Sequence, residues 1–184
     1  MVREWADLGL QHKMNKLILA LDQSTQKTGW AIYDLADKKL INYGKIDPVG
    51  ELWPRLIILK NNVKELIKKY SIGTLIIEEI QLQNIPGTSK EGNVATFKKL
   101  AYVQAILIEL AIELNIPCEI IASSSWKSIC GVKGTKRAEQ KQNAQKFVEY
   151  HYGIRATQDE CDAICIGHAH CVNCQHEDEG IFWE

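Results

Sequence analysis

The first clear pattern in the chain is a set of short apolar runs separated by polar turns. Residues 17–22, 30–35 and 40–46 are predicted to be strands, with a polar turn at 23–29 and another around 37–39. Short connections of this kind join neighbouring antiparallel strands. The first quarter of the chain therefore predicts a three-stranded antiparallel meander.

Helical periodicity then alternates with further apolar runs. Residues 54–70 and 94–114 carry apolar side chains at three- and four-residue spacing, which predicts two helices, the second apolar around much of its circumference. Residues 74–78 and 118–122 are predicted to be strands, the first of the buried, parallel kind. A basic stretch rich in helix formers and a last helix at 157–172 complete the order. The predicted fold class is α/β, with a mixed five-stranded sheet flanked by helices.

Length and composition add a domain plan to this pattern. With 184 residues, 46% of them hydrophobic, the chain suits one well-buried domain better than two. We expect an N-terminal extension at 1–15, the domain at 16–174 and an acidic tail at 175–184. No run reaches the roughly 18 apolar residues of a membrane helix, and the start lacks a signal-peptide core. These features predict a soluble cytoplasmic protein with no membrane partner, whose six cysteines are reduced.

Charge is uneven along the chain although the net charge is only -1. The segment 123–148 contains one acid, Glu139, and six basic residues: Lys127, Lys133, Lys136, Arg137, Lys141 and Lys146. A local basic patch of this kind can bind the phosphates of a nucleic acid, whatever the total charge. The alternative is an ordinary solvated helix face.

Four acids occupy positions where strands end or a helix begins. Asp22 ends the apolar run 17–21, Glu78 ends the run 75–77, and Asp159 and Asp162 lie one turn apart at the start of an apolar helix. Carboxylates that converge repel one another, and a divalent cation removes that repulsion. Hard oxygen ligands favour Mg²⁺ or Mn²⁺ over Zn²⁺. The alternative is that each acid is an ordinary strand-end or helix-start residue.

A pair of such ions, about 3.5 to 4 Å apart, activates water and stabilises the leaving oxygen in phosphodiester hydrolysis. The acids therefore indicate phosphoryl chemistry, and the basic segment indicates a nucleic-acid substrate.

Four segments together resemble a known family. ILALDQS at 18–24, TGWA at 28–31, LIIEE at 75–79 and DECDAICIGHAH at 159–170 are similar to the motifs of the RuvC Holliday-junction resolvases, in the family's order. The resemblance covers roughly residues 16–172 and is close to the relaxed-specificity branch found in bacteriophages, whose proteins would act in the host cytoplasm. It implies an RNase H-like fold and a homodimer. It also implies Mg²⁺-dependent paired nicking of four-way junctions and other branched DNA such as forks, with 5'-phosphate and 3'-hydroxyl ends.

The resemblance also implies which residues form the site, because positions of this sequence match the family's site positions. Asp22, Glu78, Asp159 and Asp162 match its catalytic, metal-binding acids, which imply two Mg²⁺ per site with Mn²⁺ as a substitute. Lys127 and Lys141 match basic positions that contact DNA, and the rest of the DNA-binding set predicted from the basic segment is Lys133, Lys136 and Arg137. Glu79 is a competing candidate, but Glu78 is preferred because the family's acid directly follows the apolar strand run. Gln81, a possible junction contact, stands where cellular members carry an aromatic wedge, so sequence preference is expected to be relaxed.

Other interpretations stay open at this stage. The same fold could serve a general nuclease of RNA or flap DNA, or a junction-binding protein without catalysis. The soft side chains from Cys161 to His176 could form a zinc site, although buried packing cysteines are more common. The long helix at 94–114 has more apolar surface than one sheet face covers, which also favours a dimer.

Overall fold

The computed structural model describes residues 16–82 and 87–178, with side chains through Cys174. One five-stranded sheet forms the centre, in the spatial order β3-β2-β1-β4-β5. Its strands are β1 (Leu17–Asp22), β2 (Thr28–Asp34), β3 (Lys39–Ile46), β4 (Thr74–Glu78) and β5 (Cys118–Ile121). The first three strands form the predicted antiparallel meander, while β4 and β5 continue the sheet in parallel with β1.

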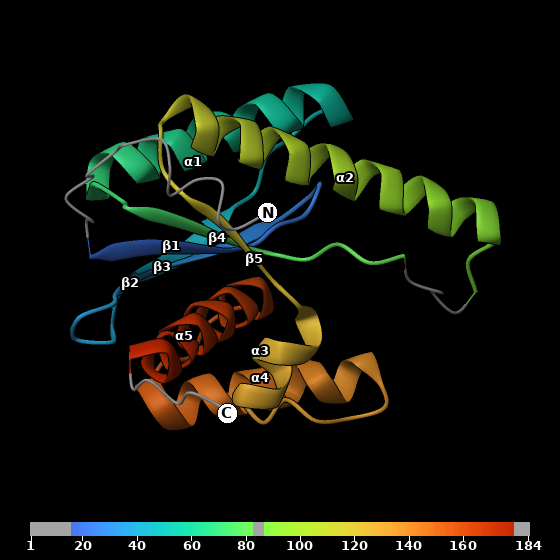
Figure 1. Cartoon of the computed structure of the whole chain (residues 1–184). Helices are drawn as coiled ribbons and strands as arrows, with labels where there is room; N and C mark the ends of the chain where they lie inside the picture. The colour runs from blue at the N-terminus through green and yellow to red at the C-terminus, as the bar shows by residue number, and fades with distance from the viewer. Residues whose placement is uncertain (1–15, 83–86, 179–184) are drawn as a thin grey trace, which may run out of the picture.

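Helices cover the sheet in two layers (Figure 1). One face is covered by α1 (Leu52–Tyr70) and α2 (Lys90–Glu113), and α2 extends past the edge of the sheet. The other face carries α3 (Ser123–Ile129), α4 (Arg137–Tyr152) and α5 (Gln158–Asp178), with α5 packed directly on β1 and β2. The predicted mixed sheet flanked by helices is confirmed.

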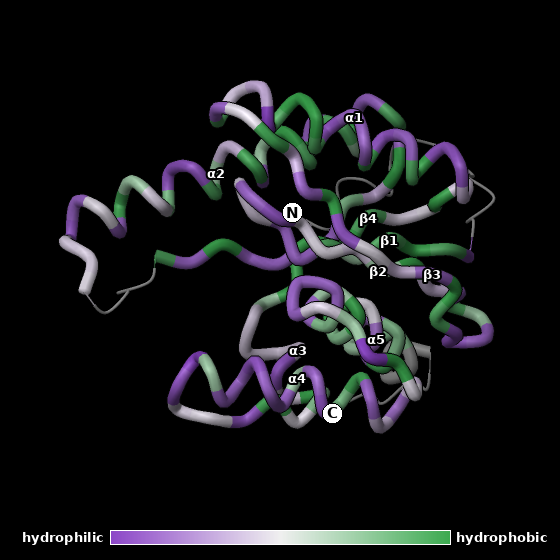
Figure 2. Tube along the Cα trace, turned by 180° about the vertical axis from the view of Figure 1, so that it is seen from behind, coloured by the Kyte–Doolittle hydropathy of each residue, from purple (hydrophilic) through white to green (hydrophobic). Residues whose placement is uncertain are grey.

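Strands β1 and β4 lie in the interior of the sheet and are deeply buried. Residues 18–21 and 75–77 are fully buried, because helices cover both faces of these strands, and such strands read as continuous apolar runs. In contrast, β3 alternates weakly and is mostly accessible, as expected of an edge strand. Figure 2 shows the same contrast between the hydrophobic residues of the central strands and the mostly hydrophilic residues of α4.

Helix α5 packs very closely against the sheet at Gly167. A Cβ atom on Gly167 would lie 2.5 Å from the ring of Tyr33 and 3.2 Å from the Cβ of Ala20, so only glycine lets the helix approach this closely. The Tyr33 hydroxyl donates to the carbonyl of Ile164 at 2.9 Å and lies 3.0 Å from the Tyr152 hydroxyl. These contacts set the height of α5 above the sheet, and hence the position of its first turn.

Several boundaries differ from the sequence prediction. The basic stretch forms two helices, α3 and α4, separated by a loop in which Gly131 and Gly134 have positive φ. The last helix runs to Asp178 rather than ending at residue 172. Residues 1–15 and 179–184, which include the predicted extension and most of the predicted tail, lie outside the described residues. Within the described part of the chain, no helix is long and apolar enough to span a membrane.

Candidate metal centre and its basic surround

Two of the predicted acids end neighbouring parallel strands. In the register of β1 with β4, Leu21 is paired with Ile77, so Asp22 and Glu78 each follow the last paired residue. Side chains alternate between the faces of a sheet. Ala20 and Ile76 belong to the core on the α5 side, and Asp22 and Glu78, two residues further on, lie on that same side.

The same alternation separates Glu78 from Glu79. Leu75 and Ile77 belong to the opposite core, under α1 and α2, so Glu79 follows them to that side, and it is exposed. The structure therefore brings Glu78, and not Glu79, toward the other predicted acids.

The other two acids lie in the first turns of α5. Thr157 precedes the helix, and the carboxylate of Glu160 accepts hydrogen bonds from the Thr157 backbone N–H at 2.7 Å and from its hydroxyl at 2.6 Å. The carboxylate of Glu160 thus reaches back to the Thr157 N–H as in one half of a capping box, which stabilises the start of a helix. Because the Glu160 carboxylate is hydrogen-bonded to Thr157, Asp159 and Asp162 are the acidic residues that the first turns present to the sheet.

A glycine on β2 brings the start of α5 close to Asp22. Gly29 is paired with Asp22 across the antiparallel ladder. A Cβ atom on Gly29 would lie 1.8 Å from the carbonyl oxygen of Asp159, so any larger residue would push α5 away. Gly29 is thus the point at which the helix carrying two acids meets the strand pair carrying a third.

The four acids lie close enough to influence one another electrostatically. Burial raises the pKa of Asp22 well above its ordinary value, and repulsion from Asp162, Glu78 and Asp159 raises it further. Burial is also the main cause that raises the pKa of Asp162 to about 6, with a further increase from Glu78. All four side chains nevertheless keep some accessible surface. The result is a half-buried cluster of mutually repelling carboxylates.

The donor chemistry of this cluster fits a hard divalent cation, which would offset the repulsion. With the side chains as they stand, no three His, Cys, Asp or Glu side chains in the described ranges lie close enough together to hold one ion. Carboxylates that repel one another are expected to stay apart until a cation draws them together.

Three of the five predicted DNA-binding residues lie close enough to act on the acids. Arg137, at the start of α4, lowers the pKa of Asp22, whereas Lys127 of α3 and Lys141 of α4 lower that of Asp162. Lys133 and Lys136 are exposed in the loop between α3 and α4. The basic residues thus form a rim beside the acidic cluster, on the same side of the sheet.

Two residues that were not predicted as site residues hold Glu78 in place. The Gln23 side chain continues the sheet ladder: its Oε1 accepts from the Glu78 N–H at 3.0 Å, and its Nε2 donates to the Glu78 carbonyl at 2.5 Å. The Trp126 indole Nε1 donates to Glu78 Oε1 at 2.9 Å. Trp126 is buried, and its hydrogen bond to Glu78 could not be predicted from sequence because the two residues are far apart in the chain.

The remaining sequence candidates lie elsewhere. Gln81 is exposed beyond the end of β4, where its amide donates to Glu79 at 3.3 Å. His168 Nδ1 lies 2.7 Å from the Tyr152 hydroxyl, and His170 lies between Glu119 and Cys174. None of the six cysteines forms a disulfide, and within the described residues their thiols form no zinc-binding group, while the side chain of residue 176 lies outside them.

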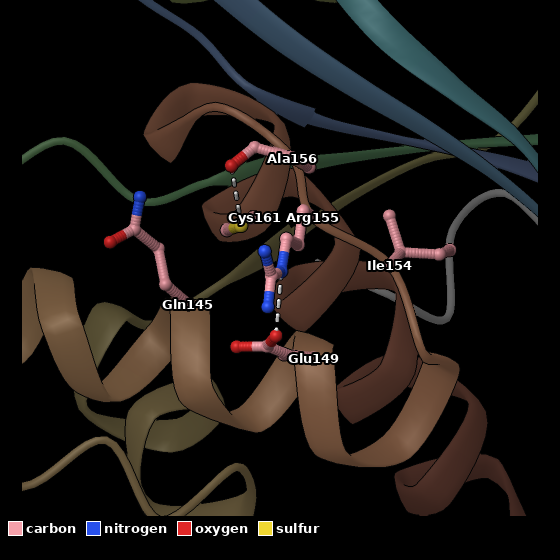
Figure 3. Close-up of a pocket in the computed structure, with 6 residues that line it drawn as sticks. All are labelled: Gln145, Glu149, Ile154, Arg155, Ala156 and Cys161. Atoms are coloured by element: carbon pink, nitrogen blue, oxygen red, sulfur yellow. Dashed lines mark hydrogen bonds and ion pairs between the residues drawn. The ribbon is translucent and has the colours of Figure 1, made fainter.

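A shallow polar pocket lies between α4 and the start of α5 (Figure 3). Its lining comprises Gln145, Glu149, Ile154, Arg155, Ala156 and Cys161. The Arg155 guanidinium forms an ion pair with Glu149 at 2.8 Å, and both side chains are exposed to solvent. The pocket is lined by none of the four acids, and an exposed ion pair of this kind contributes little to stability.

Comparison with known proteins agrees with the fold and the motifs. No family model matches the chain. The crossover junction endodeoxyribonuclease RuvC of Maricaulis maris (strain MCS10) is 27% identical over 159 residues, covering 83% of this chain and 90% of the relative. RuvC of Paramagnetospirillum magneticum (strain ATCC 700264 / AMB-1) is 27% identical over 160 residues with the same coverage.

Among solved structures, the chain is similar to T. thermophilus RuvC in complex with a Holliday junction substrate. The TM-score is 0.65 with 12% sequence identity, and the match covers 88% of this chain and 96% of that one. The sheet order and its helical layers thus define an α/β domain of the RNase H-like class. Within that class, the similarity in sequence and in fold is to the RuvC family, which supports the resemblance seen in the motifs.

Proposed function

We propose that this protein is a structure-selective endonuclease that resolves Holliday junctions and other branched DNA by metal-dependent hydrolysis of phosphodiester bonds. The observation that supports the proposal is that Asp22 lies close enough to Glu78, Asp159 and Asp162 to be repelled by them, in a domain with RuvC-like sequence and fold. A bound pair of Mg²⁺ ions, or Mn²⁺ in their place, would activate water and stabilise the leaving 3'-oxygen. The products would carry 5'-phosphate and 3'-hydroxyl ends.

The four acids lie at strand ends and in the first turns of one helix. Asp22 and Glu78 lie at the ends of strands β1 and β4, and α5 supplies Asp159 and Asp162, so the cation ligands would come from three elements, with α5 packed against Gly29 of β2. Ligands on rigid elements hold their geometry better than ligands on loops. This rigidity favours hydrolysis at one fixed position relative to the bound backbone.

The basic rim would hold the DNA backbone over the acids. Lys127, Arg137 and Lys141 lie beside the cluster, and exposed Lys133 and Lys136 extend the positive charge along the loop before α4. Each contact with a phosphate releases counterions, so binding should weaken as salt rises. The position of the rim supports a nucleic-acid substrate over a small phosphoester.

The active form is proposed to be a homodimer that makes paired nicks. On the α1 and α2 layer, Trp53 is 60% exposed, Ile57 59% and Tyr102 43%, and the Trp53 and Tyr102 rings lie 5.2 Å apart between centroids. Exposed apolar side chains that gather on one face often mark a protein–protein interface. Two symmetric sites would suit two symmetric cuts.

Relaxed sequence preference, membership of the bacteriophage-type branch and action in the host cytoplasm complete the proposal. Gln81 supports relaxed preference because its amide cannot stack on a base as an aromatic wedge would. We expect recognition to follow the shape of the branch more than its sequence.

The proposal is tested on a fixed four-way junction with each strand labelled in turn. Mg²⁺ should give paired, symmetric nicks, whereas Ca²⁺ should support binding without cleavage. Asp162→Asn should lower cleavage at least about 100-fold, because outer-sphere changes at metal sites already cost 10 to 100-fold, while junction binding is retained. Unchanged cleavage by this variant would contradict the assignment.

The substrate range separates the alternatives. Faster cleavage of a flap or an RNA–DNA hybrid than of the junction would favour a general RNase H-like nuclease. Junction binding by the wild-type protein with no cleavage in Mg²⁺ or Mn²⁺ would favour a non-catalytic binding protein.

A further inference from the structure

The Glu78 carboxylate is held by a tryptophan from a different part of the chain. Trp126 Nε1 donates to Glu78 Oε1 at 2.9 Å, and the indole is only 3% exposed. The contact follows from the sheet register. Glu78 is paired with Ile121 at the end of β5, and α3 starts two residues later, so its first turns lie beside the end of β4.

Glu78 is thus held at both its backbone and its side chain. The Gln23 amide bonds both peptide groups of Glu78, so the backbone cannot move away from β1. Trp126 donates to Oε1, so the other carboxylate oxygen, Oε2, is the more available one for a cation. We propose that Trp126 is a positioning residue that presents Glu78 to the metal through a single oxygen. This inference rests on the proposed function and deepens it.

The chemistry of indole suits this role. A buried N–H needs an acceptor, and a hydrogen bond to a carboxylate is stronger than one between neutral groups. Indole is a donor only, so it cannot ligate the metal itself, and it carries no charge that would replace the cation. A lysine at this place would neutralise Glu78 instead of orienting it.

Trp126 also links the acidic site to the DNA-binding rim. The next residue, Lys127, places its ammonium 5.2 Å from the centre of the indole ring, within the range of a cation–π contact. Consecutive residues of α3 therefore orient a metal ligand and present a cation to the substrate backbone. Lys127 stays on the accessible side while Trp126 is in the core.

The test measures Mn²⁺ binding by electron paramagnetic resonance, without DNA. Trp126→Phe keeps an aromatic ring but removes the N–H, and its Mn²⁺ affinity should fall about 10- to 100-fold, the usual effect of losing an outer-sphere partner. The Mg²⁺ concentration for half-maximal junction cleavage should rise by the same factor, with the maximal rate recovered at saturating Mg²⁺. Junction affinity in Ca²⁺ should be unchanged. Tyr150→Phe, which removes an aromatic hydrogen-bond donor at an exposed position of α4, is the matched control and should behave as wild type.

Packing is separated from hydrogen bonding by a second variant. Benzothienylalanine at position 126 keeps the shape of the indole but replaces the N–H with sulfur, so it should reproduce the loss of Mn²⁺ affinity even if Trp126→Phe folds poorly. Wild-type Mn²⁺ affinity in this variant would overturn the positioning role while leaving the proposed nuclease intact. A wild-type protein that neither binds Mn²⁺ nor cleaves a junction would overturn both.

Discussion

The side chain of residue 78 shows how much depends on the two-residue period of a strand. Glu78 and Glu79 are chemically identical neighbours, yet one lies with Asp22 on the α5 side and the other is exposed on the opposite side. Trp126 and Gln23 then bind Glu78. The structure therefore offers a pair of adjacent, matched positions at which the same substitution should have very different effects.

Glu78→Gln should lower junction cleavage at least about 100-fold, because it removes a charged ligand while keeping the shape of the side chain. Glu79→Gln should change cleavage by no more than about twofold, as is usual for an exposed position away from the site. Both variants can be compared by single-turnover cleavage in saturating Mg²⁺. The reverse ranking would assign the ligand to Glu79.

At the scale of elements, the contact between β2 and α5 determines where Asp159 and Asp162 lie. Two acids reach the site on a helix that is separated from β1 by most of the sequence, so their placement depends on how closely that helix approaches the sheet. Gly167 and Gly29 allow this approach at two points along α5. The contact at Gly29 tolerates an added Cβ atom less well than the contact at Gly167. The neighbouring atom at Gly29 is the backbone carbonyl oxygen of Asp159, which cannot rotate away.

Gly29→Ala should therefore damage both stability and activity. The new Cβ would overlap the Asp159 carbonyl, and overpacking of this kind costs about 1 to 3 kcal/mol of unfolding free energy. Cleavage should fall further than stability alone explains, because Asp159 moves with the start of α5. Urea unfolding and junction cleavage measure the two effects.

Gly92→Ala is the matched control for this change. Its Cβ would lie 2.7 Å from the Cγ2 of Thr88, the end of a side chain, and alanine is a better helix former than glycine by about 0.5 to 1 kcal/mol. This variant should be as stable as wild type or more so. A Gly29→Ala protein with wild-type stability would show that α5 is not seated on Gly29.

For the whole molecule, the site lies where the sheet changes from antiparallel to parallel pairing. β1 is shared between the meander and the parallel strands, and the ends of β1 and β4 open toward the α3 to α5 layer. Concentrating four carboxylates there works against folding in the absence of a cation. Functional sites commonly cost stability in this way.

This cost should appear in the pH dependence of stability. The folded-state pKa values of Asp22 and Asp162 lie above their ordinary values, that of Asp162 at about 6, so the folded state holds these protons more tightly. Their contribution to stability is therefore present at low pH and is lost as pH rises from about 4 through about 6. Without metal, Asp22→Asn should have a Tm equal to wild type at about pH 4 and higher by several degrees at about pH 7.5.

Added Mg²⁺ should raise the Tm of the wild-type protein at about pH 7.5 and have little effect on Asp22→Asn, because a ligand that binds only the folded state stabilises it. Differential scanning fluorimetry with EDTA or Mg²⁺ measures both effects. Equal Tm values for the two proteins at every pH would show that the acids do not repel one another in the folded state.

Local patterns in the sequence determined the elements and the candidate acids, because the spacing of apolar residues reports which face of a strand or helix is buried. The five strands, the chemistry of the four acids and the basic segment all followed from such patterns. Tertiary structure decided which side chains meet: Glu78 over Glu79, Arg137 beside Asp22, and Trp126 on Glu78. These pairings depend on strand register and on how closely helices approach the sheet. Both arise from contacts between residues distant in the chain, which no local pattern contains.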